Sequence, residues 1–190
     1  WPLVDACVRS RQHTGWLNFR MRAMLMAVAS YQLWLHWRDP ALQLARLFTD
    51  FEPGIHYSQA QMQSGLTGIN ALRIYNPVLQ SQKLDPNGEF IRRWIPELAG
   101  VPREMIHTPW LMTPTQKAKF GGNTYIAPVC DHEQAARAPR KAVGDFRKQH
   151  ISREETGRVL DRHGSRKGPH QTRPKAAAKQ TQDNQLSLFD

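Results

Sequence analysis

Residues 14–37, TGWLNFRMRAMLMAVASYQLWLHW, constrain the fold of this 190-residue chain more than any other stretch. The segment is apolar almost all round and predicts one long buried helix over 16–37, yet Arg20 and Arg22 lie near its start. Its longest apolar run, 23–29, is far shorter than the roughly 20 residues that a bilayer requires, so we expect no membrane span. Two interpretations of the helix stay open: an ordinary core helix, or the wall of a ligand pocket.

Helical spacing continues on both sides of this stretch. Residues 2–11 predict a short helix that ends near Thr14-Gly15. The apolar residues of ALQLARLFTDFEP, residues 41–53, repeat at helical intervals and predict a third helix, closed by Pro53-Gly54. Because no stretch shows the alternation that is typical of a strand, the predicted fold class is mostly α.

A turn and a further helix are predicted after residue 84. Residues 85–88, Asp-Pro-Asn-Gly, favour a type I turn, because proline suits its second position and glycine its fourth. Residues 89–94 then predict a helix that stops before Pro96, since the residue before a proline disfavours helical backbone.

Composition divides the chain into three expected parts: a helical domain over 1–110, a connector with peripheral helices over 111–163, and a disordered tail over 164–190. The formal net charge is +10, and residues 132–180 contain 13 Lys and Arg against five Asp and Glu. This basic excess is compatible with a solvated, flexible extension and with electrostatic attraction to phosphate backbones.

The middle part begins with a polar connector, residues 110–122. A surface helix is predicted to start at Asp131 as its N-cap. Pro139 is expected to kink or break that helix.

The two cysteines, Cys7 and Cys130, lie far apart and lack the spacing of a disulfide framework or of a metal site. We therefore expect a reducing, cytosolic setting and no bound metal. The sequence begins at Trp1 without a methionine or a signal peptide, which favours a fragment of something longer.

Four stretches together resemble one known family. They are PLVDACVRSRQHTGW (2–16), TGWLNFRMRAM (14–24), LFTDFEP (47–53) and the block from RIYNP to FIRRWIPEL (73–98). In this order they are similar to motifs of the flavin-binding domain of DNA photolyases and cryptochromes. The resemblance covers roughly residues 1–110 and implies the C-terminal helical part of an FAD-binding domain.

The resemblance also implies which residues contact FAD. In the family an arginine of the long helix pairs with the first aspartate of a D-x-D motif beside the flavin ring, which corresponds here to Arg22 and Asp50. Such a pair makes chemical sense, because a buried guanidinium needs a carboxylate partner. Glu52 occupies the second acidic position, which accepts a hydrogen bond from the uracil-like ring edge, and Trp16 is expected to line the same cavity. His56 occupies the position that faces the flavin N5, where it would donate a proton; the alternative is an exposed or satisfied loop histidine.

Family members carry a chain of three electron-transfer tryptophans. Trp37 matches the middle one, whereas Ala60 occupies the position nearest the flavin and the outermost position would precede Trp1. Trp34 and Tyr57 are candidates for a substitute route, and their alternative is a role as core or rim aromatics.

The positions that hold a DNA lesion depart from the family pattern. Photolyases that split cyclobutane pyrimidine dimers use an asparagine, a methionine and a tryptophan where this chain has Phe19, Ala23 and Met62. The histidine pair typical of enzymes for (6-4) photoproducts is absent. Arg20 matches a DNA-contacting arginine. The pocket is therefore expected to be apolar enough for flipped-out bases but to lack the polar groups that orient a dimer.

Full-length relatives carry an antenna-binding domain and the first half of the flavin domain before the PLVDA motif. Without that half we expect the chain on its own to bind flavin weakly or not at all. Two origins stay open: the chain is the remnant of a truncated gene, or it is the second half of a split protein whose N-terminal half another chain supplies. The function implied is light-dependent repair of pyrimidine photodimers in DNA by electron transfer from FAD. The alternative is a cryptochrome-like photoreceptor or a non-catalytic protein associated with DNA.

The chain ends in NQLSLFD, residues 184–190, with apolar residues that would gain nothing in a free tail. The segment resembles the short peptide by which bacterial repair and replication proteins bind the sliding clamp; the alternative is an incidental hydrophobic terminus. The residues expected to enter the partner's groove are Gln185, Leu186, Leu188 and Phe189.

Overall fold

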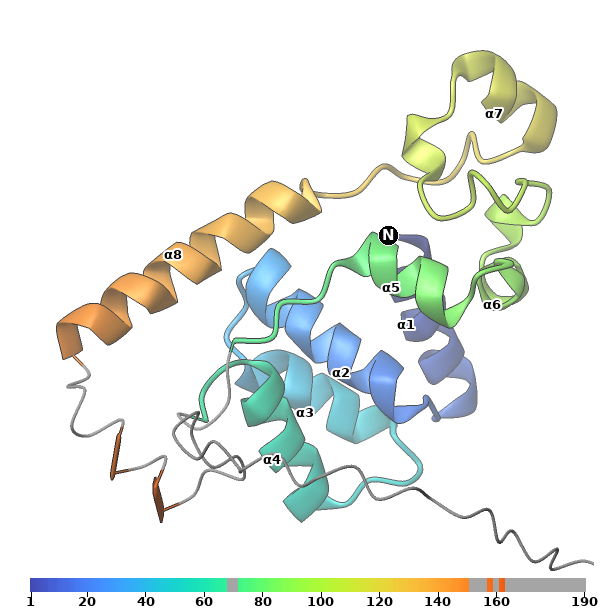
Figure 1. Cartoon of the computed structure of the whole chain (residues 1–190). Helices are drawn as coiled ribbons and strands as arrows, with labels where there is room; N and C mark the ends of the chain where they lie inside the picture. The colour runs from blue at the N-terminus through green and yellow to red at the C-terminus, as the bar shows by residue number, and fades with distance from the viewer. Residues whose placement is uncertain (68–71, 151–156, 159–160, 163–190) are drawn as a thin grey trace, which may run out of the picture. The chain divides into compact units, whose positions relative to one another are not determined.

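The computed structural model describes residues 1–67, 72–150, 157–158 and 161–162, and over these ranges it contains helices and no strand (Figure 1). The mostly α fold class is therefore confirmed. The chain divides into two units, Trp1–Ser152 and Arg153–Asp190. All that follows concerns the first unit. The predicted tail over 164–190, with its terminal peptide, lies outside the described residues.

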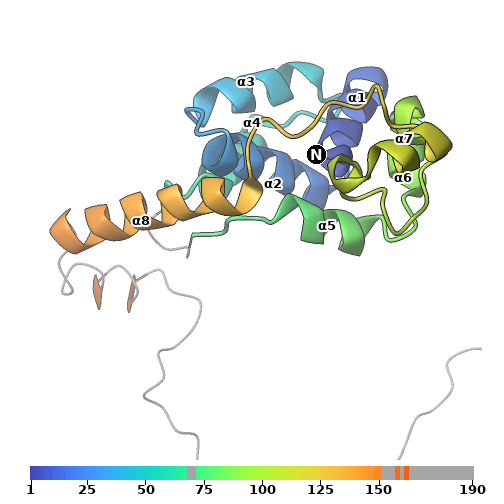
Figure 2. The same ribbon diagram turned by 90° about the horizontal axis from the view of Figure 1, so that it is seen from above.

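The helices of the first unit surround one core, and two views show their arrangement (Figures 1 and 2). Three short stretches, Val28–Gln32, Pro96–Leu98 and Pro109–Leu111, are π- or 3₁₀-helical and are labelled η1 to η3 in the text. The α-helices are α1 (Pro2–Thr14), α2 (Phe19–Ala27), α3 (Arg38–Leu47), α4 (Pro53–Gln63), α5 (Pro77–Leu84), α6 (Glu89–Trp94), α7 (Pro114–Phe120) and α8 (His132–His150).

The hydrophobic core joins the N-terminal helices to the segment around α6. α1 packs against α5 and α6, and α2 packs against α4. Removing these apolar side chains from water is the main force that holds the helices together. The fully buried side chains at its centre are Leu3, Leu17, Met24, Val28, Ile91, Ile95, Leu98, Val101 and Ile106.

The prediction of one long helix over 16–37 is wrong at both ends. α2 begins only at Phe19, because the Asn18 side chain accepts a hydrogen bond from the Met21 backbone N–H at 3.0 Å and so caps the helix. After Ala27 the backbone widens into the π-helical turn η1, and the chain then leaves the helix axis. Trp34 has a φ of 55°, which a helix interior does not allow.

The predicted first helix is confirmed, and the third ends differently from the prediction. α1 ends at Thr14, and Gly15 follows with the left-handed φ of 69° that glycine adopts without strain. α3 stops before Phe48, whose backbone is extended. Pro53 does not close this helix but begins α4, where a missing N–H costs nothing.

The turn at 85–88 and the helix at 89–94 are both confirmed. Gly88 has a φ of 72°, and its N–H donates to the Asp85 carbonyl oxygen at 2.9 Å. The Asp85 carboxylate accepts from the backbone N–H groups of Phe90 and Ile91 at 3.1 and 2.8 Å, which stabilises the first turn of α6.

The structure adds a helix to the middle part and shows that Pro139 does not break the helix that follows. The connector over 110–122 contains α7, whose start is a reciprocal capping box between Thr113 and Gln116. α8 does begin after Asp131, whose carboxylate accepts from two backbone N–H groups at 2.9 and 2.8 Å. It then continues through Pro139, which is buried, so the proline does not end the helix.

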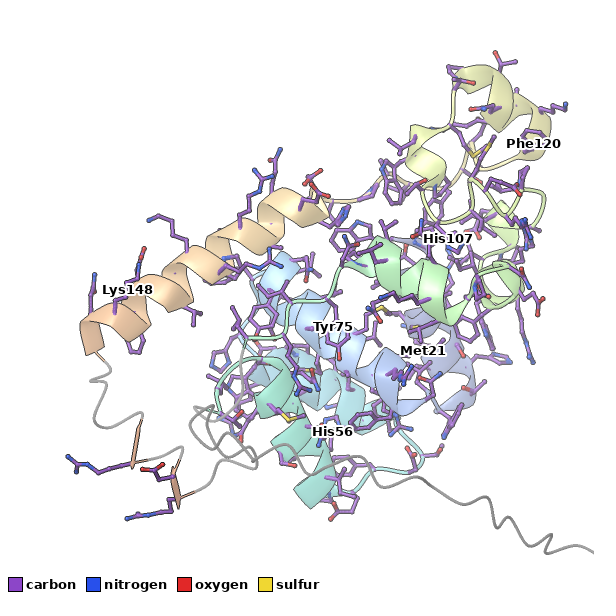
Figure 3. All side chains as sticks on the ribbon, viewed as in Figure 1. Met21, His56, Tyr75, His107, Phe120 and Lys148 are labelled. Carbon is purple, nitrogen blue, oxygen red and sulfur yellow. The ribbon has the colours of Figure 1, made fainter. Side chains whose placement is uncertain are left out.

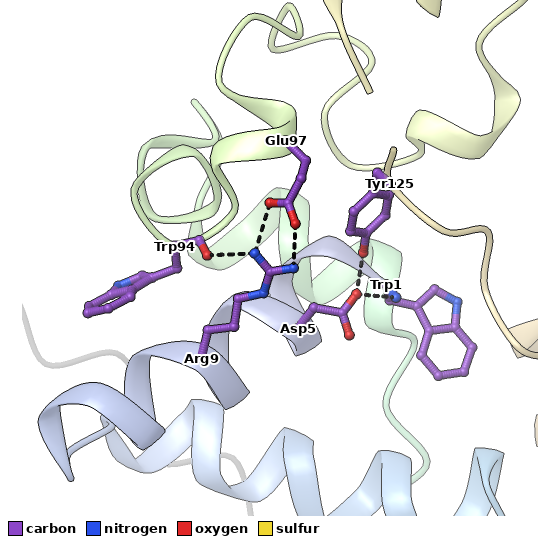
Figure 4. A network of polar contacts seen from close by, with 6 residues as sticks. All are labelled: Trp1, Asp5, Arg9, Trp94, Glu97 and Tyr125. Atoms are coloured by element: carbon purple, nitrogen blue, oxygen red, sulfur yellow. Dashed lines mark hydrogen bonds and ion pairs between the residues drawn. The ribbon is translucent and has the colours of Figure 1, made fainter. Parts of the chain in front are cut away.

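A polar network ties α1 to segments far away in the sequence (Figure 4). Arg9 donates two hydrogen bonds of 2.8 Å to the Glu97 carboxylate and one of 3.4 Å to the Trp94 carbonyl oxygen. The Arg9 guanidinium holds the pKa of Glu97 below its usual range. Asp5 accepts from the Tyr125 hydroxyl and from the Trp1 amino group. The network fixes the end of α6 on the first helix.

The structure also shows the state of the two cysteines and whether any described helix could span a membrane. Cys7 is buried and Cys130 is partly exposed, and both are free thiols. No helix in the described ranges combines the length and the apolar character needed to cross a membrane.

Candidate functional site

A cavity of about 190 Å³ lies between α2, α4 and the segment that joins α3 to α4. Its α2 wall is apolar, because Phe19, Ala23 and Met26 repeat at helical spacing along one face. Its α4 wall carries polar groups, among them His56, which Figure 3 labels. The complete lining is Phe19, Arg22, Ala23, Met26, Leu44, Phe48, Asp50, Phe51, Glu52, Ile55, His56, Gln59, Ala60 and Gln63.

Arg22 and Asp50 meet at this cavity. The Arg22 Nη2 donates to Asp50 Oδ2 at 2.7 Å, and its Nε donates to the Leu17 carbonyl oxygen at 2.6 Å. The guanidinium carbon lies 4.0 Å from the centre of the Phe48 ring, which adds a cation–π contact. The hydrogen bond that Arg22 donates to the Asp50 carboxylate lowers the pKa of Asp50 below its usual value. The side chains are 24% and 47% exposed, so the pair lies at the edge of the cavity and not deep in the interior.

Glu52 lines the cavity but is also the N-cap of α4. Its Oε2 accepts from the Ile55 backbone N–H at 2.6 Å. A carboxylate in this position is favoured by the positive end of the helix dipole. One of its two oxygens is thus committed to the helix.

His56 is neither exposed nor in a loop. It lies in the first turn of α4, and its Nε2 lies 2.8 Å from the Ala41 carbonyl oxygen. Since a carbonyl only accepts, Nε2 carries a proton, and in the neutral ring Nδ1 is an acceptor. The ring also makes edge-on contacts with Phe51 and Tyr57, with centroids 5.4 and 5.2 Å apart. The Nε2 atom of His56 is therefore hydrogen-bonded within the protein, and the residue lines the cavity.

Two lining residues, Gln59 and Gln63, were not among the sequence-predicted site residues. Gln63 is 2% exposed, and the Oε1 atoms of both side chains are buried and have no hydrogen-bond partner among the described residues. The available signal was their spacing, since positions 56, 59 and 63 share one helix face. The shared face can be recognised only once residues 53–63 are known to form the helix α4.

The residues matched to lesion and DNA contacts divide into two groups. Phe19 and Ala23 line the cavity, with Phe19 58% exposed at its edge and Ala23 buried. Arg20 is exposed beside them. Met62 is half-buried on α4 and is not among the lining residues, so it is not brought to this cavity.

None of the three tryptophans considered in the sequence analysis, Trp16, Trp34 and Trp37, lines this cavity. Trp16 does not line the cavity: it is 56% exposed, because it precedes the start of α2. Trp37 is half-buried and packs against the core just before α3. Trp34, 61% exposed, shares a second hollow with it, between η1 and α8. Ala60 is buried in the wall of the first cavity.

The first cavity has the chemistry of a slot for a flat heteroaromatic ring. Apolar side chains form one wall, a row of hydrogen-bonding groups forms the other, and a fixed positive charge with its counter-charge lies at the edge. A volume of about 190 Å³ is below the roughly 300 Å³ at which whole ligand pockets begin, so the slot has room for only part of a larger ligand. The fold and the site thus describe a helical domain with a slot whose walls suit a flat ring.

The chain belongs to the family described as the FAD binding domain of DNA photolyase, whose model matches residues 1–145. The match extends beyond residue 110, where the recognisable motifs end. FAD is therefore the cofactor of its family.

Named relatives include both branches of this family. The chain is 32% identical over 152 residues to the deoxyribodipyrimidine photo-lyase of Alkalihalophilus pseudofirmus, covering 77% of this chain and 31% of the relative. It is 36% identical over 156 residues to cryptochrome-2 of Arabidopsis thaliana, covering 80% of this chain and 26% of the relative. It thus spans about a third or less of the length of these relatives.

Solved structures agree with the helical arrangement. A bacterial class III photolyase from Agrobacterium tumefaciens superposes with a TM-score of 0.72 at 28% identity, covering 78% of this chain and 32% of that one. An archaeal photolyase from Sulfolobus tokodaii, described with two FAD molecules, gives a TM-score of 0.68 at 26% identity, covering 76% and 32%.

The residues of the cavity fit the flavin ring of FAD. Gln63 supplies a buried carbonyl that has no partner in the part of the chain that the structure describes, Glu52 keeps one oxygen available, and the α2 wall offers the flat apolar surface that a ring covers. The residues that would hold the ring are Arg22, Asp50, Glu52 and His56 at the polar side and Ala23 and Met26 at the apolar side.

Proposed function

We propose that this chain is the ring-binding part of a photolyase-like flavoprotein, whose activity is the light-dependent splitting of pyrimidine photodimers in DNA. The observation that carries the proposal is the Arg22–Asp50 ion pair, 2.7 Å long, at the edge of a slot with one apolar and one polar wall. An ion pair at this place offers fixed charge to a ring that gains and loses an electron.

Bound FAD would supply the electron that passes to the damaged pyrimidine pair and returns after bond cleavage. The chain's own contribution is to hold and shield the ring. Arg22 is kept in place by three contacts, with Asp50, Leu17 and Phe48, so its charge needs no rearrangement during electron transfer.

His56 has a narrower role than the sequence indicated. Because Nε2 is committed to the Ala41 carbonyl oxygen, the ring donates a proton toward the cavity only when both nitrogens are protonated.

DNA is the proposed substrate partner, and it would approach the open side of the cavity. Phe19 offers an exposed ring on which a flipped-out base can stack, and Arg20 offers a charge for a phosphate. The formal net charge of +10 favours approach to nucleic acid.

A cryptochrome-like photoreceptor is the second candidate function. It is favoured by the absence of polar side chains at Phe19 and Ala23, where a dimer would need to be oriented, and by the position of Met62 away from the cavity. Trp34 and Trp37, which share the second hollow, would then serve as electron donors from the surface.

Two further partners are part of the proposal. Leu33, Trp34 and Leu35 are 41%, 61% and 50% exposed, and apolar surface of this kind favours a covering segment, either from the part of the family's domain that these 190 residues do not span or from another chain. The terminal residues 185–189 are proposed to bind a bacterial sliding clamp, as their sequence pattern indicates.

The experiment that tests the proposed function is a flavin titration followed by illumination. The purified chain, alone and with a supplied N-terminal half from a relative, is titrated with FAD by fluorescence, and thymine-dimer DNA is then added under blue light in the presence of a reductant. Repair of the dimer supports a photolyase. Flavin binding without repair supports the photoreceptor, and no flavin binding in either form contradicts both.

A further inference from the structure

We propose that the carboxamides of Gln59 and Gln63 bind the imide edge of the flavin ring, the –CO–NH–CO– side, beside the one oxygen of Glu52 that does not hold the start of α4. This inference rests on the proposed flavin function and goes beyond it by assigning the residues that recognise the ring edge. Neither glutamine belongs to the motifs that pointed to FAD.

The first argument is the unmet hydrogen-bonding capacity of the two side chains. The Oε1 atoms of Gln59 and Gln63 are buried without a partner among the described residues, and Gln63 is only 2% exposed. A buried carbonyl without a hydrogen bond destabilises a fold, so such groups need a reason to be there. Because both residues line the cavity, a donor on a bound ligand would complete them.

The second argument is geometrical. Glu52, His56, Gln59 and Gln63 follow one another at intervals of four, three and four residues, so they form one ridge along α4. All four line the cavity. The ridge faces the apolar row of Phe19, Ala23 and Met26 on α2, and the two helices pack together. A flat ring placed between the rows has one face against apolar side chains and an edge toward the carboxamides.

The third argument is the commitment of Glu52. Its Oε2 caps α4 through the Ile55 N–H at 2.6 Å, and its carboxylate carries no hydrogen to donate. A carboxamide differs in this respect, since it offers a carbonyl acceptor and an NH₂ donor in one plane. An imide edge presents an N–H between two carbonyls, and a carboxamide satisfies both kinds of group at once.

The fourth argument is the space that Ala60 leaves. This residue is buried in the cavity wall between the two glutamines, and its methyl group is small. Long side chains at 59 and 63 therefore extend past it into the slot.

The test compares two flavins that differ only at the imide nitrogen. Lumiflavin carries the N–H, and 3-methyllumiflavin does not. Affinities are measured by fluorescence titration with the full 190-residue chain, with Gln63→Met, which keeps the side-chain length, and with Gln61→Met, a control on the same helix that does not line the cavity.

We expect Gln63→Met to weaken lumiflavin binding about tenfold, or about 1.4 kcal/mol, and to change 3-methyllumiflavin binding less than twofold. Gln61→Met should leave both affinities unchanged. An equal loss for both flavins, or no loss for lumiflavin, overturns the inference and leaves the proposed function intact. Failure of the unaltered chain to bind either flavin, both alone and with the supplied N-terminal half, contradicts the proposed function itself.

Discussion

Replacing Asp50 by Asn separates what the ion pair contributes to folding from what it contributes to the ring site. In the absence of ligand, Arg22 would keep its 2.6 Å hydrogen bond to the Leu17 carbonyl oxygen and its contact with the Phe48 ring. The Asp50 side chain is 47% exposed, so the pair is screened by water. Exposed ion pairs contribute about 0.2–1 kcal/mol, and we expect Asp50→Asn to lower the free energy of unfolding by about 0.5 kcal/mol.

The effect on flavin affinity should be much larger. A ring that covers the slot excludes water from the pair, and removal of one partner then leaves the Arg22 charge without compensation. Such losses cost about 3 kcal/mol, which corresponds to roughly a hundredfold loss of affinity. Stability and affinity should therefore respond to the same substitution by very different amounts.

Urea unfolding without flavin and fluorescence titration with FAD measure the two quantities. Asp145→Asn is the matched control, because it removes an exposed ion pair with Lys141 on α8 that does not line the cavity. It should leave the flavin affinity unchanged and lower the free energy of unfolding by a similarly small amount, about 0.3–0.5 kcal/mol. The reasoning is refuted if Asp50→Asn destabilises the fold by 3 kcal/mol or more, or if it leaves flavin affinity unchanged.

Three further outcomes are expected. Since the pKa of Asp50 is lowered in the folded chain, the pair's stabilising effect is present above the unfolded carboxyl pKa of about 3.9 and is lost as the pH falls through the lower folded value; the difference in free energy of unfolding between the unaltered chain and Asp50→Asn should therefore stay constant above this range and shrink below it. Gly88→Ala should cost about 3 kcal/mol in urea unfolding, because a Cβ there lies 2.7 Å from the Ile106 side chain at positive φ, whereas Gly144→Ala on open α8 should not destabilise. Burial raises the pKa of the Cys7 thiol to about 12, so iodoacetamide at pH 8 should label only Cys130 in the native chain, and equal labelling of both would contradict this core.

The sequence was sufficient for most of the helical segments, because their signals are local. Gly15 ends α1, and the turn at 85–88 begins α6, as their residue types indicate. The break of the long helix at η1 was not predictable in this way, since apolar residues continue through it. Its cause is tertiary: Gln32 donates to the Tyr75 carbonyl oxygen at 2.6 Å, and the Ser30 hydroxyl pairs with that of Ser64 at 2.8 Å.

The site residues also divide into those that the sequence could indicate and those that only the three-dimensional structure brings together. Arg22 and Asp50 lie 28 residues apart, and only their resemblance to a known motif brought them together before the structure did. Pro53 was interpreted as the end of a helix, although proline also begins helices, and this choice hid the face that carries Gln59 and Gln63. Trp16 was expected in the cavity from the resemblance alone, but Asn18 starts the helix after it and its side chain is 56% exposed.

The central claim is that a flavin ring lies between α2 and α4, and the methionine methyl groups report on it directly. Met26 lines the slot, whereas Met112 is buried in the core away from the lining residues. In a ¹³C-methyl methionine NMR spectrum, addition of lumiflavin should shift the Met26 signal through the ring current and leave the Met112 signal in place. A shift of Met112 with an unchanged Met26 signal would contradict this location for the ring.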